Sequence, residues 1–107
     1  MIVIENKIEE CITDELENAM SNHEPFHSEH EAWAVLTEEY DEAYEETNKI
    51  ECSLSTMWHY IKSDCHIEVR EQFEQIREFA KHLAEEACQI CAVCDKAEAY
   101  YRANEKR

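Results

Sequence analysis

The stretch HEAWAVLTEEYDEAYEE, residues 30–46, carries seven acidic side chains among its seventeen residues and keeps its large apolar residues at helical spacing. Steps of three and four residues between apolar positions are typical of an amphipathic helix that packs against another helix. The apolar stripe comprises Trp33, Leu36, Tyr40, Ala43, Thr47 and Ile50. Several carboxylates therefore lie directly beside a stripe that is expected to be buried, where an isolated charge is costly.

The composition of the whole chain also predicts helices. Its 107 residues include no glycine and one proline, and a sheet protein without glycine at its turns would be unusual. We therefore predict an all-α, single-domain helical bundle over residues 1–107. A chain of this length buries only a modest core, so we expect a homodimer or a higher homo-oligomer to complete it.

Four helices are expected from the apolar pattern. Cys52 and Ser53 are expected to end the second helix, and a long C-terminal helix follows the third. The predicted ranges are 4–20, 29–51, 54–61 and 66–103.

Capping residues mark two of the predicted helix starts. Ser28 and Glu31 are spaced as a capping box at the start of the second helix, after an interruption at Pro25. Asp64 is expected to cap the long C-terminal helix.

The charge of the chain excludes some classes of partner. With 26 acidic and 10 basic residues the formal charge is -16, which repels nucleic-acid backbones and anionic membrane surfaces. No apolar run reaches membrane-spanning length, and no signal peptide is apparent at the N-terminus. Six cysteines without a secretory signal indicate reduced thiols, so we expect a cytoplasmic protein.

The heptad phase places specific acids on one flank of the stripe. With Trp33 at position a, Glu39 falls at g, Glu42 at c and Glu46 at the next g. Glu39 and Glu42 are one helical turn apart and so lie on the same flank.

The C-terminal helix offers matching positions. Its predicted seam comprises Ile76, Ala80, Leu83, Ala87, Ile90, Cys94, Ala97 and Tyr101. With Ala80 at a, Glu86 falls at g and Gln89 at c, the same phase as Glu39 and Glu42. In an antiparallel pair the g positions face each other, so we expect these four oxygen-bearing side chains to converge. Converging carboxylates suit a hard cation such as Mg²⁺; the alternative is a rim of exposed glutamates with ordinary ion-pair partners.

A family resemblance is carried by the same residues. Glu38 to Glu42 read EExxE, and the chain resembles the all-α nucleoside triphosphate pyrophosphohydrolases of the MazG and dimeric dUTPase type. The segments FHSEHEAWAVLTEEYDEAYEE (26–46) and AEEACQICAVCDKA (84–97) are similar to a small MazG-like group found in prophages. These segments cover helices in two separate parts of the chain.

The resemblance implies a function and a set of site residues. It implies Mg²⁺, or Mn²⁺, held by Glu39, Glu42 and Glu86, and hydrolysis of a nucleoside triphosphate to a monophosphate and pyrophosphate. Glu38 and Glu39 would be the catalytic acids, with Glu38 supporting the site or positioning water. Gln89 stands where the family has an aspartate, so it would ligate without a negative charge. The alternative is a catalytically degenerate prophage helical protein that serves as an interaction or structural module.

Two further sets of residues have competing interpretations. The acids Glu68, Glu71 and Glu74 form rival ExxE pairs, but the heptad phase puts Glu71 and Glu74 on the outer face. Three residues are candidate substrate contacts, each with a structural alternative. These are Lys96 (phosphate contact or salt bridge), His82 (substrate contact or surface histidine) and Trp33 (base stacking or core packing).

Cys88, Cys91 and Cys94 form CxxCxxC, a spacing that invites a zinc or cluster interpretation. On a helix, residues six apart point about 120° away from each other, so the three thiols do not converge on one ion. We therefore expect these cysteines to pack in the core.

Overall fold

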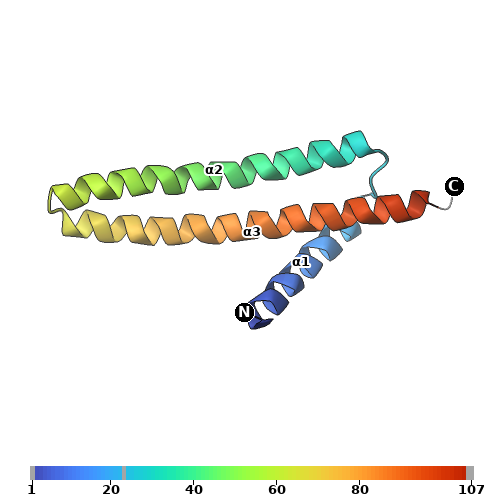
Figure 1. Ribbon diagram of the computed structural model, residues 1–107, viewed down its shortest axis with the longest axis horizontal. Helices are drawn as coiled ribbons and strands as arrows, with labels where there is room; N and C mark the ends of the chain where they lie inside the picture. Colours follow the sequence, from blue (N-terminus) through green and yellow to red (C-terminus); the bar gives the residue numbers. More distant parts are fainter. Residues whose placement is uncertain (1, 23, 106–107) are drawn as a thin grey trace. The chain divides into compact units, whose positions relative to one another are not determined.

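The computed structural model describes residues 2–22 and 24–105, and this part of the chain contains three α-helices and no strand (Figure 1). The helices are α1 (Ile2–Asn22), α2 (Glu29–Lys62) and α3 (His66–Asn104). The all-α class and the long C-terminal helix are therefore confirmed. None of the three helices is both long enough and apolar enough to cross a membrane.

The chain forms two compact units. The first comprises the described residues up to Tyr40 and from Glu86 onward, so it holds α1, the first part of α2 and the last part of α3. The second runs from Asp41 to Glu85. In the second unit the remaining parts of α2 and α3 run side by side in opposite directions and are joined by a short turn (Figure 1).

The predicted break after residue 51 is wrong, because α2 continues through Cys52 and Ser53 to Lys62. Ser53 is 5% exposed, and its hydroxyl donates a hydrogen bond of 2.8 Å to Oε1 of the buried Gln72. A serine whose hydroxyl is used in this way does not compete with the helix for backbone hydrogen bonds. The segments predicted as the second and third helices are thus one helix.

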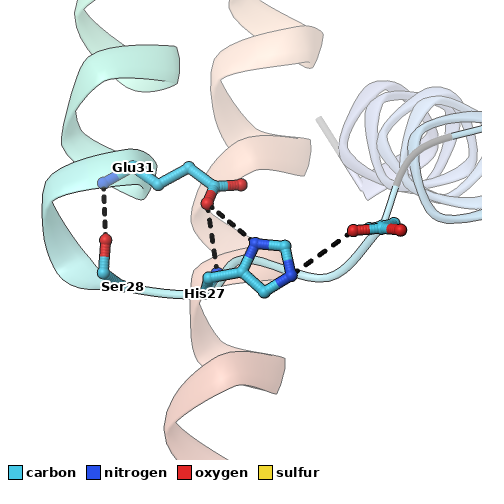
Figure 2. A network of polar contacts seen from close by, with 4 residues as sticks. His27, Ser28 and Glu31 are labelled. Atoms are coloured by element: carbon cyan, nitrogen blue, oxygen red, sulfur yellow. Dashed lines mark hydrogen bonds and ion pairs between the residues drawn. The ribbon is translucent and has the colours of Figure 1, made fainter.

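The start of α2 follows the predicted capping residues. The backbone N–H of Glu31 donates to Oγ of Ser28 at 3.1 Å, which is the N-cap hydrogen bond (Figure 2). The carboxylate of Glu31 accepts a hydrogen bond from the backbone N–H of His27 at 3.3 Å and lies 3.1 Å from Nδ1 of its ring. The acid therefore bonds the residue before the N-cap, where a capping box would have it bond Ser28 itself.

Asp64 belongs to the end of α2 and is not shown to cap α3, contrary to the expectation. Its φ of 54° is left-handed, and its N–H donates to the carbonyl of Ile61 at 3.2 Å. The N–H of Cys65 donates to the carbonyl of Tyr60 at 3.0 Å. These two bonds form a Schellman motif, in which the left-handed position is usually glycine. In a chain without glycine, aspartate takes that position because it tolerates the left-handed conformation better than most residues.

The predicted seams are correct at the d positions and wrong at the a positions. On α2, Ala43 is buried and Leu36 and Ile50 are partly buried, whereas Trp33 and Tyr40 are 68% and 57% exposed. The g positions turn inward in their place, among them Glu39, Glu46 and Ser53. On α3, Ala80, Ala87, Cys94 and Tyr101 are likewise exposed. The inward face of each helix is thus rotated toward the flank that carries the acids.

Each unit has a small core. No described side chain is fully buried; the buried apolar residues are Ile12, Phe26 and Ala92 in the first unit and Ala43 and Met57 in the second. Many large apolar side chains on all three helices remain exposed. Exposed apolar surface of this kind is what the predicted homo-oligomer would cover.

Candidate metal centre and the adjoining cavity

Two carboxylates of the first unit face each other from α2 and α3. Glu39 and Glu86 are both partly buried, and each offers an oxygen within 4.8 Å of the other. Glu42 follows Glu39 by one turn of α2 but belongs to the second unit, so the group in the first unit is the facing pair Glu39 and Glu86.

Gln89 lies between the two acids of the first unit. The amide orientation that satisfies all partners has Nε2 donating to Oε2 of Glu39 at 2.8 Å and to Oε2 of Glu86 at 3.0 Å. The amide therefore donates hydrogen bonds to two negatively charged groups at once. Rotation of the amide by half a turn would present Oε1 to the same place.

The donor set fits a hard divalent cation. Both side chains of the facing pair offer carboxylate oxygens, the ligand type that Mg²⁺, Mn²⁺ and Ca²⁺ prefer. With the amide of Gln89 turned, its oxygen would join them. The pair is therefore a candidate metal site, and Gln89 offers both acids a hydrogen-bond partner in the structure as it stands.

A cavity of about 540 Å³ lies in the first unit beside this group. Glu39 and Gln89 belong to its lining, together with residues of α1, of the connection between α1 and α2, and of α3. This volume is in the range of small-molecule sites. The lining combines several carboxylates with apolar side chains and one buried ammonium.

The buried ammonium belongs to Lys96, which is 8% exposed. Its Nζ lies 4.4 Å from the centroid of the Phe26 ring, a cation–π contact. Within the described residues no oxygen accepts a hydrogen bond from Nζ or lies within ion-pair distance of it, so the predicted salt bridge is not found. Phe26 was not predicted to pack in the core, although an apolar residue directly after Pro25 in an acidic connection was a usable signal.

His27 lies between two acids of the cavity wall. Its Nε2 is 3.4 Å from Oε2 of Glu24, and its Nδ1 is 3.1 Å from Oε2 of Glu31 (Figure 2). The hydrogen bond from His27 lowers the pKa of Glu31, and the nearby charge of Lys96 acts in the same direction. Both carboxylates therefore have a partner within the connection itself.

The other predicted substrate contacts lie elsewhere. Trp33 is exposed on α2 and is not part of the cavity lining, so the core-packing alternative for it is wrong. His82 belongs to the second unit, where its Nδ1 is 3.8 Å from Oε2 of Glu46. Glu38 is exposed and is not a member of the carboxylate group. Of the three predicted contacts, Lys96 is the one that shares a cavity with Glu39.

The rival acids and the cysteines form no metal group in the described residues. Glu71 and Glu74 are exposed, as their heptad phase indicated. Cys91 and Cys94 are also exposed, which contradicts the expected core packing for these two. Cys88 is partly buried, and burial raises the pKa of its thiol, with a smaller contribution from Cys11.

Comparison of the chain with protein-family models, with curated proteins and with solved structures gave no match.

Proposed function

We propose that the protein is a Mg²⁺-dependent nucleotide pyrophosphohydrolase of the MazG-like type, which cleaves a nucleoside triphosphate to a monophosphate and pyrophosphate. The observation that carries the proposal is the facing pair Glu39 and Glu86, set beside a cavity of ligand size. The EExxE sequence of residues 38–42 supports the same interpretation.

Each residue of the group has a defined part in this proposal. Glu39, Glu42 and Glu86 would hold the metal, and Gln89 would turn its amide oxygen toward it. A bound Mg²⁺ would polarise phosphate oxygens and offset the charge that develops on them. Glu38 directly precedes Glu39 and is exposed. It would position the attacking water and accept its proton.

An assay of product formation tests this proposal. The protein is incubated with Mg²⁺ and each nucleoside triphosphate in turn, and pyrophosphate and monophosphate are measured. Glu39→Gln should abolish release, whereas Glu45→Gln, the same charge change at an exposed position of α2, should leave it unchanged. Equal release by the wild type and Glu39→Gln, or none by the wild type, would contradict the proposal.

A second candidate function is a non-catalytic helical interaction module. It is favoured by the hydrogen bonds of Gln89, which satisfy Glu39 and Glu86 without a cation. In this case the wild type would release no pyrophosphate, and Glu39→Gln would be neutral or stabilising.

Either function is compatible with a homo-oligomer, which we propose forms through the outer face of α2. Trp33, Tyr40, Leu54 and Ile61 fall on one heptad series and are each 44% or more exposed. Light scattering should give a multiple of the 12.7 kDa chain mass, and Leu54→Glu should reduce it. A monomer at all concentrations would contradict this part of the proposal.

A further inference from the structure

The cavity of the first unit holds two opposite charges that do not meet. Lys96 brings its buried ammonium from α3, and Glu15 brings a partly buried carboxylate from α1. No ion pair joins them, and among the described residues Glu15 has no hydrogen bond or ion pair; its charge acts on the Cys88 thiol, whose pKa it helps to raise. The cavity therefore separates a positive group from a negative one.

The remaining carboxylates of the lining are already in use. Glu24 and Glu31 flank His27, and Glu39 accepts a hydrogen bond from Gln89. Glu15 is thus the acid that is left to meet a ligand.

The buried ammonium of Lys96 points to an anionic ligand group. Lys96 is 8% exposed as a residue, so its ammonium has limited access to water, and the face of the Phe26 ring compensates only part of the lost hydration. A ligand oxyanion entering the cavity would restore the missing hydrogen bonds.

The charge of the cavity limits which anion can enter. Four carboxylates line it against one ammonium, so its formal charge is -3 with His27 neutral. This excess negative charge would repel a multiply charged anion. A ligand with one carboxylate and one ammonium adds no net charge and would not be repelled in this way. Between the charged groups the wall is apolar and includes Phe26, Val35, Ala92 and Val93.

We propose that this cavity binds a small aliphatic zwitterion, with its carboxylate on Lys96, its ammonium on Glu15 and its methylene chain against the apolar wall. This site needs no metal, but it uses the cavity in which the proposed hydrolase activity would place its nucleotide, so the two ligands would compete. The same cavity could not then hold a phosphate group on Lys96 at the same time.

The probes are straight-chain ω-amino acids from aminobutanoate to aminooctanoate, titrated without metal and followed by amide chemical shifts. Matched alkanoates and alkylamines of the same lengths carry only one of the two charges. At least one amino acid of the series should bind, and at least tenfold more tightly than its two single-charge analogues. The shifted amides should lie in residues around the cavity.

Variants identify the groups that bind. Lys96→Met keeps the length of the side chain and should abolish binding, whereas Lys96→Arg should retain it. Glu15→Gln removes the charge that would hold the ligand's ammonium and should weaken binding at least tenfold. The matched controls are Lys81→Met, at an exposed position of α3, and Glu17→Gln, at an exposed position of α1. Circular dichroism establishes that each variant is folded.

Three outcomes would overturn the proposal. The first is no binding by any member of the series, and the second is equal binding of an alkylamine, which would make this a cation site. The third is undiminished binding in either Lys96→Met or Glu15→Gln. Loss of Mg²⁺–nucleotide binding in Lys96→Met, with no zwitterion bound by the wild type, would assign Lys96 to phosphate.

Discussion

The side-chain nitrogen of Gln89 donates a hydrogen bond of 2.8 Å to Oε2 of Glu39, and the same nitrogen lies 3.0 Å from Oε2 of Glu86. One neutral amide thus bridges two carboxylates that belong to different helices. The arrangement makes the group stable without a cation and compatible with one, because the other end of the amide is an oxygen. If the proposed metal binds here, Gln89 would couple stability without metal to metal affinity.

Replacing this amide by a carboxylate should separate the two properties. Gln89→Glu removes both donated bonds and adds a like charge, so the free energy of unfolding without metal should fall by roughly 1–3 kcal/mol. The added charge should tighten Mg²⁺ binding by about tenfold or more. Urea unfolding with and without Mg²⁺ measures both effects. Gln75→Glu, at an exposed position of α3, is the control and should show neither. Equal responses of the two variants to Mg²⁺ would argue against a metal centre at Gln89.

Replacing the left-handed residue after α2 by glycine should stabilise the protein. Asp64 has a φ of 54°, which glycine adopts without steric cost. Asp64→Gly should therefore raise the free energy of unfolding by roughly 0.5–1 kcal/mol. Asp64→Ala, which keeps the Cβ and loses the polar group, should give no gain. Thermal unfolding compares the three proteins, and an Asp64→Gly variant less stable than Asp64→Ala would refute the motif.

The buried hydrogen bond between Ser53 and Gln72 should stabilise the second unit. Ser53→Ala leaves the buried amide of Gln72 without its 2.8 Å partner and should lower the free energy of unfolding by roughly 1–2 kcal/mol. Ser55→Ala, at an exposed position of the same helix, is the matched control. If the two variants unfold at the same urea concentration, the hydrogen bond contributes nothing.

The contribution of Glu31 should depend on pH. Because its hydrogen bond with His27 lowers the pKa of Glu31 in the folded protein below 4.5, ionised Glu31 stabilises the fold. This stabilisation is fully present above the pKa of the unfolded state and is lost as the pH falls through the lower, folded-state pKa. The stability difference between wild type and Glu31→Gln should thus be constant near neutral pH and vanish in acid. Glu45→Gln is the control. If the stability difference between the wild type and Glu31→Gln were the same at pH 7 and in acid, the hydrogen bond with His27 would not be its cause.

Much of the local structure follows from local rules that the sequence displays. The capping hydrogen bond of Ser28 and the convergence of Glu39 with Glu86 rest on spacing, which a helix translates directly into position. The continuation of α2 through Ser53 does not, because it depends on a partner, Gln72, that lies nineteen residues away. The helix propensities of neighbouring residues cannot predict a hydrogen bond to a residue so far along the chain.

The rotation of the inward face shows a second limit. Large aromatic residues such as Trp33 and Tyr40 suggested the buried flank, yet the carboxylates of Glu39 and Glu46 turn inward instead. Hydrophobicity alone favours the opposite choice. The inward orientation of these acids is explained by their partners. Glu39 accepts a hydrogen bond from Gln89, and Oε1 of Glu46 lies 3.2 Å from Nζ of Lys49.

The most direct test of the metal centre is calorimetric titration of the metal-free protein with Mg²⁺ and with Mn²⁺. Saturable binding is expected for the wild type and for Glu45→Gln, and its loss is expected for Glu39→Gln. No binding to the wild type, or equal binding to Glu39→Gln, would contradict the metal centre and leave these carboxylates as partners of Gln89 alone.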